Sequence, residues 1–489
     1  MDLNEIIQQR KDKLESLKKK DTLLYDSAPE GRADIASALA DFKEGAKVTF
    51  CGRIMARRSH GKVTFMDIKD STGKIQLYLK ADFIGEKGVS LLEDIDIGDI
   101  VCVKGELFKT HTGEPSVKAE DFMVLSKALR PLPEKWHGLR DVDARYRQRY
   151  LDLISNEDVK KVFALRSRII RSIRDLLDAR GFQEVETPMM HSIPGGAAGR
   201  PFKTFHNEYG FELYLRIAPE LYLKRLLVGG LDRVYEINRS FRNEGVSTRH
   251  NPEFTMLEVY SAYDNFEGMM RLAQDMIINA AKAVLNTDKF SYQGKDVDLA
   301  LPWQRLSFEG IVKEKFDISP GDEPEAMLKK LHEKGFAREA AKLTRSQVGK
   351  VIEDILEQGI NMNPTFVTDY FTNLSPLAKT KKENPLVSER FELYVAGMEI
   401  GNAYSELNNP IEQKKRFEEE VKELAAEEKK SVDEDYCLAL EHGMPPAGGL
   451  GIGIDRLVML LTDQPSIRDV LLFPLLRPLE EDQEKDHAV

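Results

Sequence analysis

The chain has 489 residues, of which 42% are hydrophobic and 31% are charged, and its formal net charge is −11. At roughly 100–200 residues per domain, this length predicts about two to four domains, and the acidic balance argues against a protein that coats nucleic acid over its whole surface. The charge is uneven, because residues 1–80 carry 16 Lys and Arg against 12 Asp and Glu, and this local +4 permits a confined nucleic-acid contact.

The first 45 residues predict a helical segment. Leu3, Ile6, Ile7, Leu14 and Leu17 are spaced to line one face of a helix, and the opposite face is expected to carry Arg10, Lys11, Lys13 and the lysines at 18–20. The basic residues fit either a solvated surface or an RNA contact, and the pattern does not choose between them. The segment lacks the apolar block of a secretory signal.

Residues 46–128 change to the alternation that is typical of strands. Four runs rich in β-forming residues are separated by turn signals, at 47–58, 62–68, 74–80 and 100–107. About five short strands in this span predict a small Greek-key barrel, either an OB-fold or an SH3-like barrel.

Residues 129–145 hold prolines that interrupt both the helical and the strand periodicity, and they predict a linker. A larger domain over 146–478 opens on a long helix that ends at Gly181, followed by strand-like runs. Residues 320–380 predict an insertion of short amphipathic helices and 411–434 a very charged helix, whereas 479–489 predict a disordered acidic tail.

The three cysteines, Cys51, Cys102 and Cys437, are far apart in the sequence and form no CxxC or Cys/His cluster. Neither a disulfide framework nor a zinc site is expected, and a reducing cytoplasm is the natural setting. No apolar run approaches the roughly 18 residues of a membrane span, so no membrane partner is expected.

The sequence has no P-loop, no Rossmann glycine fingerprint, and no GxSxG or HExxH motif. Residues 235–260 instead hold Arg239, Arg242, Arg249 and His250 among four glutamates, in two predicted strands joined by a loop. Guanidinium groups bind phosphate oxygens bidentately, so this segment suits a polyphosphate ligand. A hairpin of surface ion pairs is the alternative.

Two further segments suggest ligand contacts. Between 448 and 456, glycines alternate with aliphatic residues before Arg456, which fits either the close approach of a ligand or tight packing of a strand on a helix. Glu392 and Glu399 lie among apolar neighbours, where carboxylates could share magnesium ions with nucleotide phosphates. Solvated surface glutamates are the alternative.

These segments together resemble the three motifs of the class II aminoacyl-tRNA synthetases. Residues 171–188 look like the first, dimer-forming motif, FRNEG and RHNPEFTMLE like the second, and GLGIGIDR like the third. A barrel before the catalytic domain is similar to the subgroup charging lysine, aspartate and asparagine. Within it, residues 193–202, 216–226 and 399–408 resemble the bacterial lysyl-tRNA synthetases, with departures only at Gly199 and Ala403.

The resemblance implies an α+β multidomain enzyme, with an N-terminal OB-fold barrel for anticodon binding and a catalytic domain built on an antiparallel sheet flanked by helices. It implies activation of L-lysine with ATP to lysyl-adenylate, and then transfer to the 3′-hydroxyl of the terminal adenosine of the tRNA for lysine. A cytoplasmic homodimer that uses Mg²⁺ is implied as well.

The resemblance also implies roles for single residues. The catalytic residues would be Arg242, Glu392, Glu399 and Arg456, with the two glutamates ligating magnesium. ATP binding adds Glu244, His250 and Phe254, and Phe254 and Arg456 would enclose the adenine. Lysine binding falls to Gly196, Glu220, Arg242, Glu258, Tyr260, Asn402 and Glu406. Anticodon binding falls to Arg58, Phe65, Gln76 and Glu114.

The charge of the pocket that would bind the amino-acid side chain discriminates between substrates. Glu220 and Glu406, with no compensating cation expected in their motifs, suit an ammonium group, whereas an aspartate pocket would need a cation. The alternatives are an aspartyl or asparaginyl enzyme, a lysine-ligating paralogue that modifies a protein and lacks the barrel, and a non-catalytic RNA-binding protein. Intact Arg242 and Arg456 argue against the last.

Overall fold

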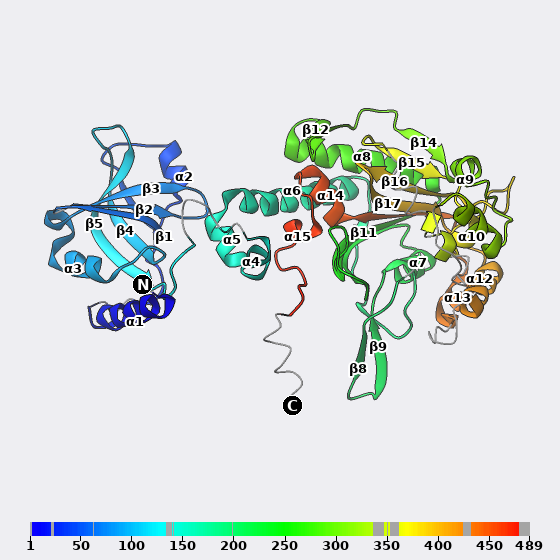
Figure 1. Cartoon of the computed structure of the whole chain (residues 1–489), viewed down its shortest axis with the longest axis horizontal. Coiled ribbons are helices and arrows are strands. Elements are labelled where there is room, and N and C mark those ends of the chain that lie inside the picture. Colours follow the sequence, from blue (N-terminus) through cyan, green and yellow to red (C-terminus); the bar gives the residue numbers. More distant parts are fainter. Residues whose placement is uncertain are drawn as a thin grey trace. The chain divides into compact units, whose positions relative to one another are not determined.

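The computed structural model describes residues 2–20, 24–61, 63–133, 139, 141–197, 199–335, 347–349, 351–352, 361–423 and 432–478. The chain forms two compact units, Met1–Arg140 and Asp141–Val489, and Figure 1 labels their elements. Among the described helices, none combines the length and the apolar character that a membrane crossing requires. The expected acidic tail and residues 336–346, 350 and 353–360 of the expected 320–380 insertion fall outside the described residues.

The first unit is a small barrel with helices. Its elements are α1 (Leu3–Lys20), α2 (Ile35–Ala40), β1 (Lys47–His60), β2 (Val63–Lys69), β3 (Lys74–Lys80), α3 (Ala81–Asp94), β4 (Ile100–Lys109) and β5 (Pro115–Ser126). The strands close in the order β1-β2-β3-β5-β4, and only β3 and β5 pair in parallel. Of the two predicted alternatives, the OB-fold and the SH3-like barrel, this five-stranded barrel is the OB-fold. Helix α3 was not predicted.

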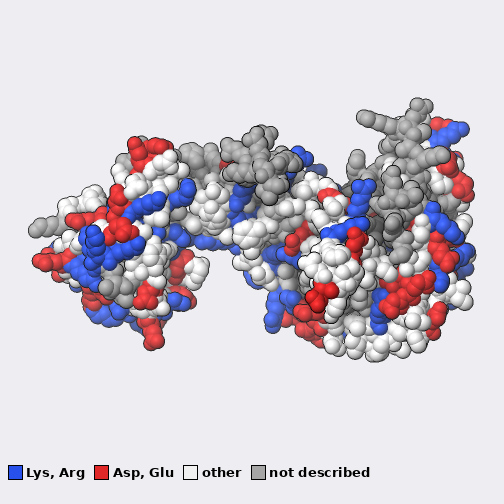
Figure 2. Space-filling model, turned by 90° about the horizontal axis from the view of Figure 1, so that it is seen from below, with Lys and Arg blue, Asp and Glu red and all other residues white. Residues whose placement is uncertain are grey.

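Helix α1 corrects one expectation from the sequence. Arg10 was expected on the basic face of this helix, opposite its apolar residues, but it is buried. Its guanidinium donates hydrogen bonds to the carbonyl oxygens of Ala128 at 2.8 Å and Arg130 at 3.0 Å. Position 10 shares the helical stripe of Leu3, Leu14 and Leu17, so a long side chain there reaches the barrel. On the face of this unit seen in Figure 2, basic and acidic side chains are interspersed.

The second unit is built on a large sheet. Before the insertion its elements are α4 (Val142–Arg147), α5 (Arg149–Ser155), α6 (Glu157–Ala179), β6 (Gln183–Glu184), β7 (Met190–His191), β8 (Lys203–His206), β9 (Phe211–Leu215), α7 (Glu220–Val228), β10 (Arg233–Phe241), β11 (Glu253–Ala262), α8 (Phe266–Leu285), β12 (Lys289–Tyr292), β13 (Lys295–Asp298) and β14 (Gln304–Ser307). Helix α6 ends as predicted, because Gly181 follows it with a φ of 77° and the Phe182 amide donates to the Leu177 carbonyl at 3.1 Å.

The remaining elements complete the sheet and its cover. They are α9 (Phe308–Phe316), α10 (Pro324–Glu333), β15 (Thr365–Thr368), the 3₁₀ turn η1 (Thr372–Leu374), β16 (Arg390–Val395), β17 (Met398–Ser405), α12 (Pro410–Glu423), α13 (Glu434–Glu441), β18 (Ala447–Gly453), α14 (Ile454–Leu461) and α15 (Ile467–Val470). The sheet order is β14-β15-β16-β17-β18-β11-β10-β6. Its central pairs are antiparallel, as expected, and only the β14–β15 and β10–β6 pairs are parallel.

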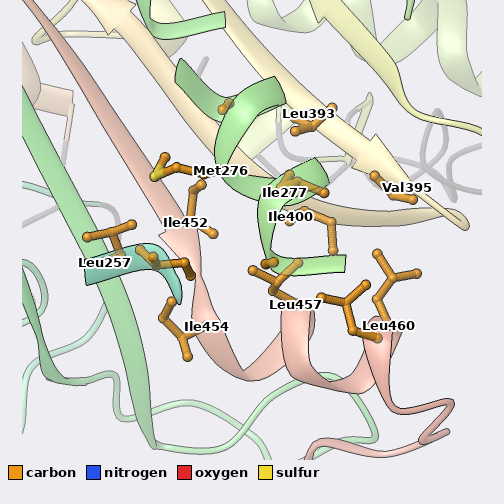
Figure 3. Close-up of a cluster of buried hydrophobic side chains, with 14 of the residues drawn as sticks. Leu257, Met276, Ile277, Leu393, Val395, Ile400, Ile452, Ile454, Leu457 and Leu460 are labelled. Atoms are coloured by element: carbon orange, nitrogen blue, oxygen red, sulfur yellow. The ribbon is translucent and has the colours of Figure 1, made fainter. Parts of the chain in front are cut away.

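Alternation along the central strands separates a packed face from a polar face. Leu257 on β11, Ile452 on β18 and Leu393 on β16 belong to one buried cluster with Ile277 of α8 and Leu457 of α14, as Figure 3 shows. The neighbouring positions on the same strands must then point to the opposite face. That face carries the polar residues singled out from the sequence.

Candidate active site

A cavity of about 1190 Å³ lies on the polar face of the sheet. Its walls come from the loop before β8, the first turn of α7, the β10–β11 hairpin, β16, β17, and the junction of β18 with α14. Eleven residues predicted from the sequence line it: Gly196, Glu220, Arg242, Glu244, His250, Phe254, Glu258, Glu392, Glu399, Asn402 and Arg456. Tyr260 and Glu406 do not line it, but lie buried behind it.

Arg242 follows the end of β10 and points its guanidinium over the ring of Phe254, 5.1 Å from the ring centroid. Its Nε is buried and has no hydrogen-bond partner among the described residues. Burial lowers the pKa of Arg242, although Glu244 opposes this, and a guanidinium remains a cation in proteins. An unsatisfied donor on a buried cation favours an anionic ligand.

Arg456 lies at the first turn of α14 and contacts two other predicted residues. Its Nη1 donates to Glu399 Oε2 at 3.0 Å and to the Glu399 carbonyl at 2.8 Å. Its Nη2 is 3.1 Å from His250 Nε2. These side chains come from β17, the β10–β11 loop and α14, and the fold gathers them at one end of the cavity. Arg242 and His250 both line the cavity, whereas Arg239 forms an ion pair with Glu253 at 3.3 Å.

Glu392 is buried and held in one orientation. Its Oε2 accepts hydrogen bonds from Tyr370 at 2.7 Å and from Tyr394 at 2.6 Å, and Oε1 contacts Arg390. Burial raises the pKa of Glu392, the Arg390 charge lowers it, and the Glu399 charge raises it further. A cation between these two carboxylates would relieve their repulsion.

The described residues contain no group of three or more His, Cys, Asp and Glu side chains that could hold a metal ion alone. Magnesium is usually bound by one or two carboxylates together with substrate phosphates and water. Glu392 and Glu399 therefore fit a magnesium ion that arrives with a nucleotide.

A lysine that was not predicted lies behind the cavity. Lys224 is fully buried, its Nζ is 2.5 Å from Glu220 Oε1, and it is ion-paired with Glu406 Oε2. Burial lowers the pKa of Lys224, but the charges of Glu220 and Glu406 outweigh burial and raise it. Lys224 is therefore a resident cation, and the expectation of no compensating cation was wrong. Its spacing of four residues from Glu220 on one helix was the signal.

The two carboxylates keep capacity for another cation. Glu220 also accepts a hydrogen bond from the Tyr404 hydroxyl at 2.5 Å. Neither side-chain oxygen of Glu406 has a hydrogen bond among the described residues, beyond its ion pair with Lys224. One lysine cannot neutralise two ionised carboxylates, and burial raises the pKa of Glu406 well above its usual value although Lys224 opposes this, so a second cation would favour the ionised form.

Glu258 adds a third carboxylate to this end. Tyr260 donates its hydroxyl to Glu258 Oε2 at 2.9 Å, and both residues lie on β11. Burial, with a contribution from the Glu220 charge, raises the pKa of Glu258 to about 8. A nearby cationic ligand would favour the ionised form and would release this proton.

Gly449 on β18 leaves the space that Tyr260 and Glu406 occupy. A Cβ at this position would lie 1.9 Å from Glu406 Oε1 and 2.6 Å from the Tyr260 ring. The glycines of this strand were expected to allow close approach, and here the approach is by two buried side chains. The structure also brings in Arg390, whose Nε donates to Asn402 Oδ1 at 3.1 Å; nothing in its sequence context singled it out.

The barrel residues share one outer face of the first unit. Register pairs Arg58 with Phe65 and Phe65 with Tyr78 across β1, β2 and β3. Phe65 is half-buried and does not belong to the barrel core; its ring centroid is 5.4 Å from that of Tyr78. Tyr78, which was not predicted, is also 5.7 Å from Phe108.

Gln76 differs from its neighbours because it is buried. Its Nε2 donates to Glu114 Oε2 at 3.3 Å, and its Oε1 accepts from Ser116 Oγ at 3.1 Å. Rings beside polar groups on an outer sheet face are typical of surfaces that stack unpaired bases.

Comparison with known proteins gives consistent matches. Residues 141–477 match the family described as "tRNA synthetases class II (D, K and N)", and residues 48–125 match the "OB-fold nucleic acid binding domain". The chain is 53% identical to the lysine–tRNA ligase of Pelotomaculum thermopropionicum, with 98% of this chain and 96% of the relative covered. It is 51% identical to that of Carboxydothermus hydrogenoformans, over 98% and 99%, and 50% identical to that of Staphylococcus aureus, over 90% and 89%.

The space at Gly449 gives a test of the packing behind the cavity. Gly449→Ala should destabilise the second unit by about 1–3 kcal/mol, because overpacking forces buried groups apart. Urea unfolding followed by Trp303 fluorescence, in a Trp136→Phe background, measures this. Gly451→Ala is the matched control, since its Cβ would make ordinary contacts with Met256 Cε at 3.7 Å and the Asn402 carbonyl oxygen at 3.8 Å. Equal effects of the two substitutions would contradict the packing argument.

Proposed function

The chain belongs to the class II tRNA synthetases of the aspartate, lysine and asparagine group, and we propose that it is a lysine–tRNA ligase. In this proposal, ATP and L-lysine form lysyl-adenylate and pyrophosphate. The lysyl group then passes to the 3′-hydroxyl of the terminal adenosine of the tRNA for lysine. Aspartate or asparagine as the substrate is not favoured, since the relatives reported above are lysine–tRNA ligases.

The observation that carries the proposal is the charge at the floor of the cavity. With lysine bound, ionised Glu220, Glu258 and Glu406 would supply three negative charges and Lys224 one positive charge, whereas without a cationic ligand burial raises the pKa of both Glu258 and Glu406. The two ammonium groups of a bound lysine would bring the sum to zero. An aspartate or asparagine side chain would leave Glu220 and Glu406 without a second cation, and an uncompensated buried charge costs about 3–5 kcal/mol.

The roles within the lysine site follow from this balance. The side-chain ammonium would lie between Glu220 and Glu406, and Tyr260 would border its apolar stem. Glu258, the Gly196 carbonyl and Asn402 would bind the α-amino end, which leaves the carboxylate facing Arg242. Support comes from the lining of one cavity by five of these residues and from the unsatisfied oxygens of Glu406.

The first chemical step would be attack of the lysine carboxylate on the α-phosphorus of ATP. A new C–O–P linkage forms, the bond to the bridging oxygen breaks, and pyrophosphate leaves with its electron pair. A carboxylate is already ionised, so the step needs no general base. Arg242 would bind both the carboxylate and the α-phosphate and so align them. His250 and Glu244 would contact the ATP, and the adenine would lie between Phe254 and Arg456.

Magnesium held by Glu392 and Glu399 would supply positive charge to the phosphate oxygens. The carboxylate pair, whose repulsion already raises the pKa of Glu392, supports such a site. Arg390, Tyr370 and Tyr394 would keep Glu392 aimed at it. Arg456 also contacts Glu399 and His250, which would orient its guanidinium at this end of the cavity.

In the second step the terminal 3′-hydroxyl would attack the carbonyl carbon of the adenylate, and AMP would leave. The first unit would bind the anticodon with Arg58, Phe65, Gln76 and Glu114. Tyr78 and Phe108 extend the aromatic row and would add stacking, worth about 1–3 kcal/mol per base. A homodimer through α6 and β6 and a cytoplasmic location complete the proposal. Strand β6 lies at an edge of the sheet, which leaves it able to pair.

Amino-acid-dependent exchange between ATP and pyrophosphate, without tRNA, tests the reaction. Lysine should support exchange, and aspartate and asparagine should not. Arg242→Ala should lower the rate by about 10²–10³-fold, because it removes a donor at the reacting phosphate. Glu406→Gln should raise the KM for lysine by about tenfold or more, since a hydrogen bond to a charge is worth about 1.5–3 kcal/mol. Exchange that depends on aspartate instead would overturn the assignment of lysine as the substrate. No exchange with any of the three amino acids would overturn the proposed activity.

The resident cation gives a second test. Lys224→Met should raise the KM for lysine by at least about tenfold and leave the KM for ATP within about twofold, because one of two unpaired buried carboxylates will take up a proton. The exchange assay measures both constants. Lys414→Met is the matched control, since Lys414 pairs with Glu434 at 2.8 Å on the surface. An unchanged KM for lysine would reduce Lys224 to a packing role.

The pKa of Glu258, raised to about 8, gives a third test. Glu258 is largely protonated in the free protein at neutral pH, and an α-ammonium group binds its ionised form. The Kd for lysine should therefore fall as the pH rises from about 6 to 8, by up to about tenfold per unit. Calorimetry in buffers of different ionisation enthalpy should detect the released proton. Glu258→Gln should abolish this release; release that persists would assign the proton to another group.

A further inference from the structure

Two of the three cysteines lie opposite each other in the barrel. Antiparallel register pairs Cys51 on β1 with Cys102 on β4. Along the same pair of strands, the Leu107 amide donates to the Ala46 carbonyl and the Ile54 amide to the Asp99 carbonyl. Hydrogen-bonded pairs recur at every second residue. Counting from these two pairs, Cys51 and Cys102 form a non-hydrogen-bonded pair.

This type of pair brings two side chains close together. In non-hydrogen-bonded antiparallel pairs, the Cα atoms are about 4.5 Å apart and the side chains share one face. Disulfides span Cα separations of about 4.4–6.8 Å. The backbone is therefore already within the range at which the two sulfurs can be joined, although 50 intervening residues separate the cysteines in the sequence.

The two thiols differ in exposure and in pKa, and this difference suits a reaction in which Cys51 reacts first and Cys102 second. Cys51 is partly exposed, whereas Cys102 is buried, and both are free. A hydrogen bond from Cys102, assisted by the charge of Arg32, lowers the pKa of Cys51 to about 7 against the effect of burial. The same hydrogen bond and burial raise the pKa of Cys102. A thiol with a pKa near the ambient pH attacks disulfides fastest.

We propose that Cys51 and Cys102 form a thiol–disulfide exchange site that reacts with small disulfides of the glutathione type. The Cys51 thiolate attacks one sulfur of the disulfide, and the S–S bond breaks to release one thiol after protonation. Cys102 then loses its proton and attacks the sulfur of Cys51, which forms the cross-strand bond and releases the second thiol. The protein loses two electrons and two protons, and the small disulfide gains them.

The site is separate from the proposed ligase chemistry and does not depend on it. It lies on β1, the strand whose far end carries Arg58, so the cross-link would tie together two strands of the barrel. The third cysteine offers an internal comparison. Cys437 is buried on α13, and burial raises its pKa, so it has neither the exposure nor the acidity that the reaction needs.

The test is treatment of the full chain with oxidised glutathione, followed by intact mass and non-reducing peptide mapping. The wild-type chain should lose the mass of two hydrogens and yield a peptide that links Cys51 to Cys102. Cys102→Ser should instead accumulate one glutathione on Cys51, because the resolving thiol is missing. Cys51→Ser should gain none at position 102. Cys437→Ser should behave as the wild type.

Two results would overturn the proposal. One is a chain that keeps both thiols free under conditions in which oxidised glutathione fully converts a small-molecule thiol of similar acidity to a disulfide. The other is equal glutathione addition in the Cys51→Ser and Cys102→Ser variants, since the asymmetry of the pair would then be absent. Loss of the linked peptide on dithiothreitol treatment checks that the link is a disulfide.

Discussion

The ion cluster of Lys224, Glu220 and Glu406 is the interaction on which the site depends. Both ends of the salt bridges are removed from water, so each charge relies on the others to offset its desolvation. The cluster joins α7 to the end of β17 and occupies the space that Gly449 leaves on β18. Two carboxylates share one lysine in this cluster, and burial raises the pKa of Glu406, so a second cation placed here would be stabilised by a carboxylate that lacks a full partner.

The same strands build the core and the reaction site. On β11, β16 and β18, one set of alternating residues packs against α8 and α14, and the other set faces the cavity. A shift of one residue in the pairing of β11 with β18 would turn both sets over. The positions of Phe254, Glu258 and Glu392 are therefore held by apolar packing on the opposite face, which is a rigid support for the groups that line the cavity.

In the barrel, too, one strand contributes both to the core and to surface features. One strand, β1, contributes to the apolar interior through Phe50 and Ile54, to the row of Arg58 and Phe65, and to the cysteine pair. Each of these features comes from register: residues distant in sequence become partners because antiparallel strands place them opposite each other. The register thus places a row of rings on the outer face and two thiols on adjacent strands, with no dedicated loop.

The sequence by itself determined a barrel of about five short strands, the long helix that ends at Gly181, and the charged segments around Arg242, Glu392 and Arg456, because strand alternation, turn residues and short motifs are local signals. Alternation left the OB-fold and the SH3-like barrel open, and the family resemblance implied the OB-fold and the antiparallel sheet. The sequence misplaced Arg10 and missed α3, Lys224, Arg390 and the aromatic row with Tyr78. Only the tertiary structure decided that Glu220 and Glu406 share a buried lysine and that Cys51 faces Cys102. These are pairings between segments far apart in the chain, and a single sequence states the residue types but not which distant strands and helices bring them together.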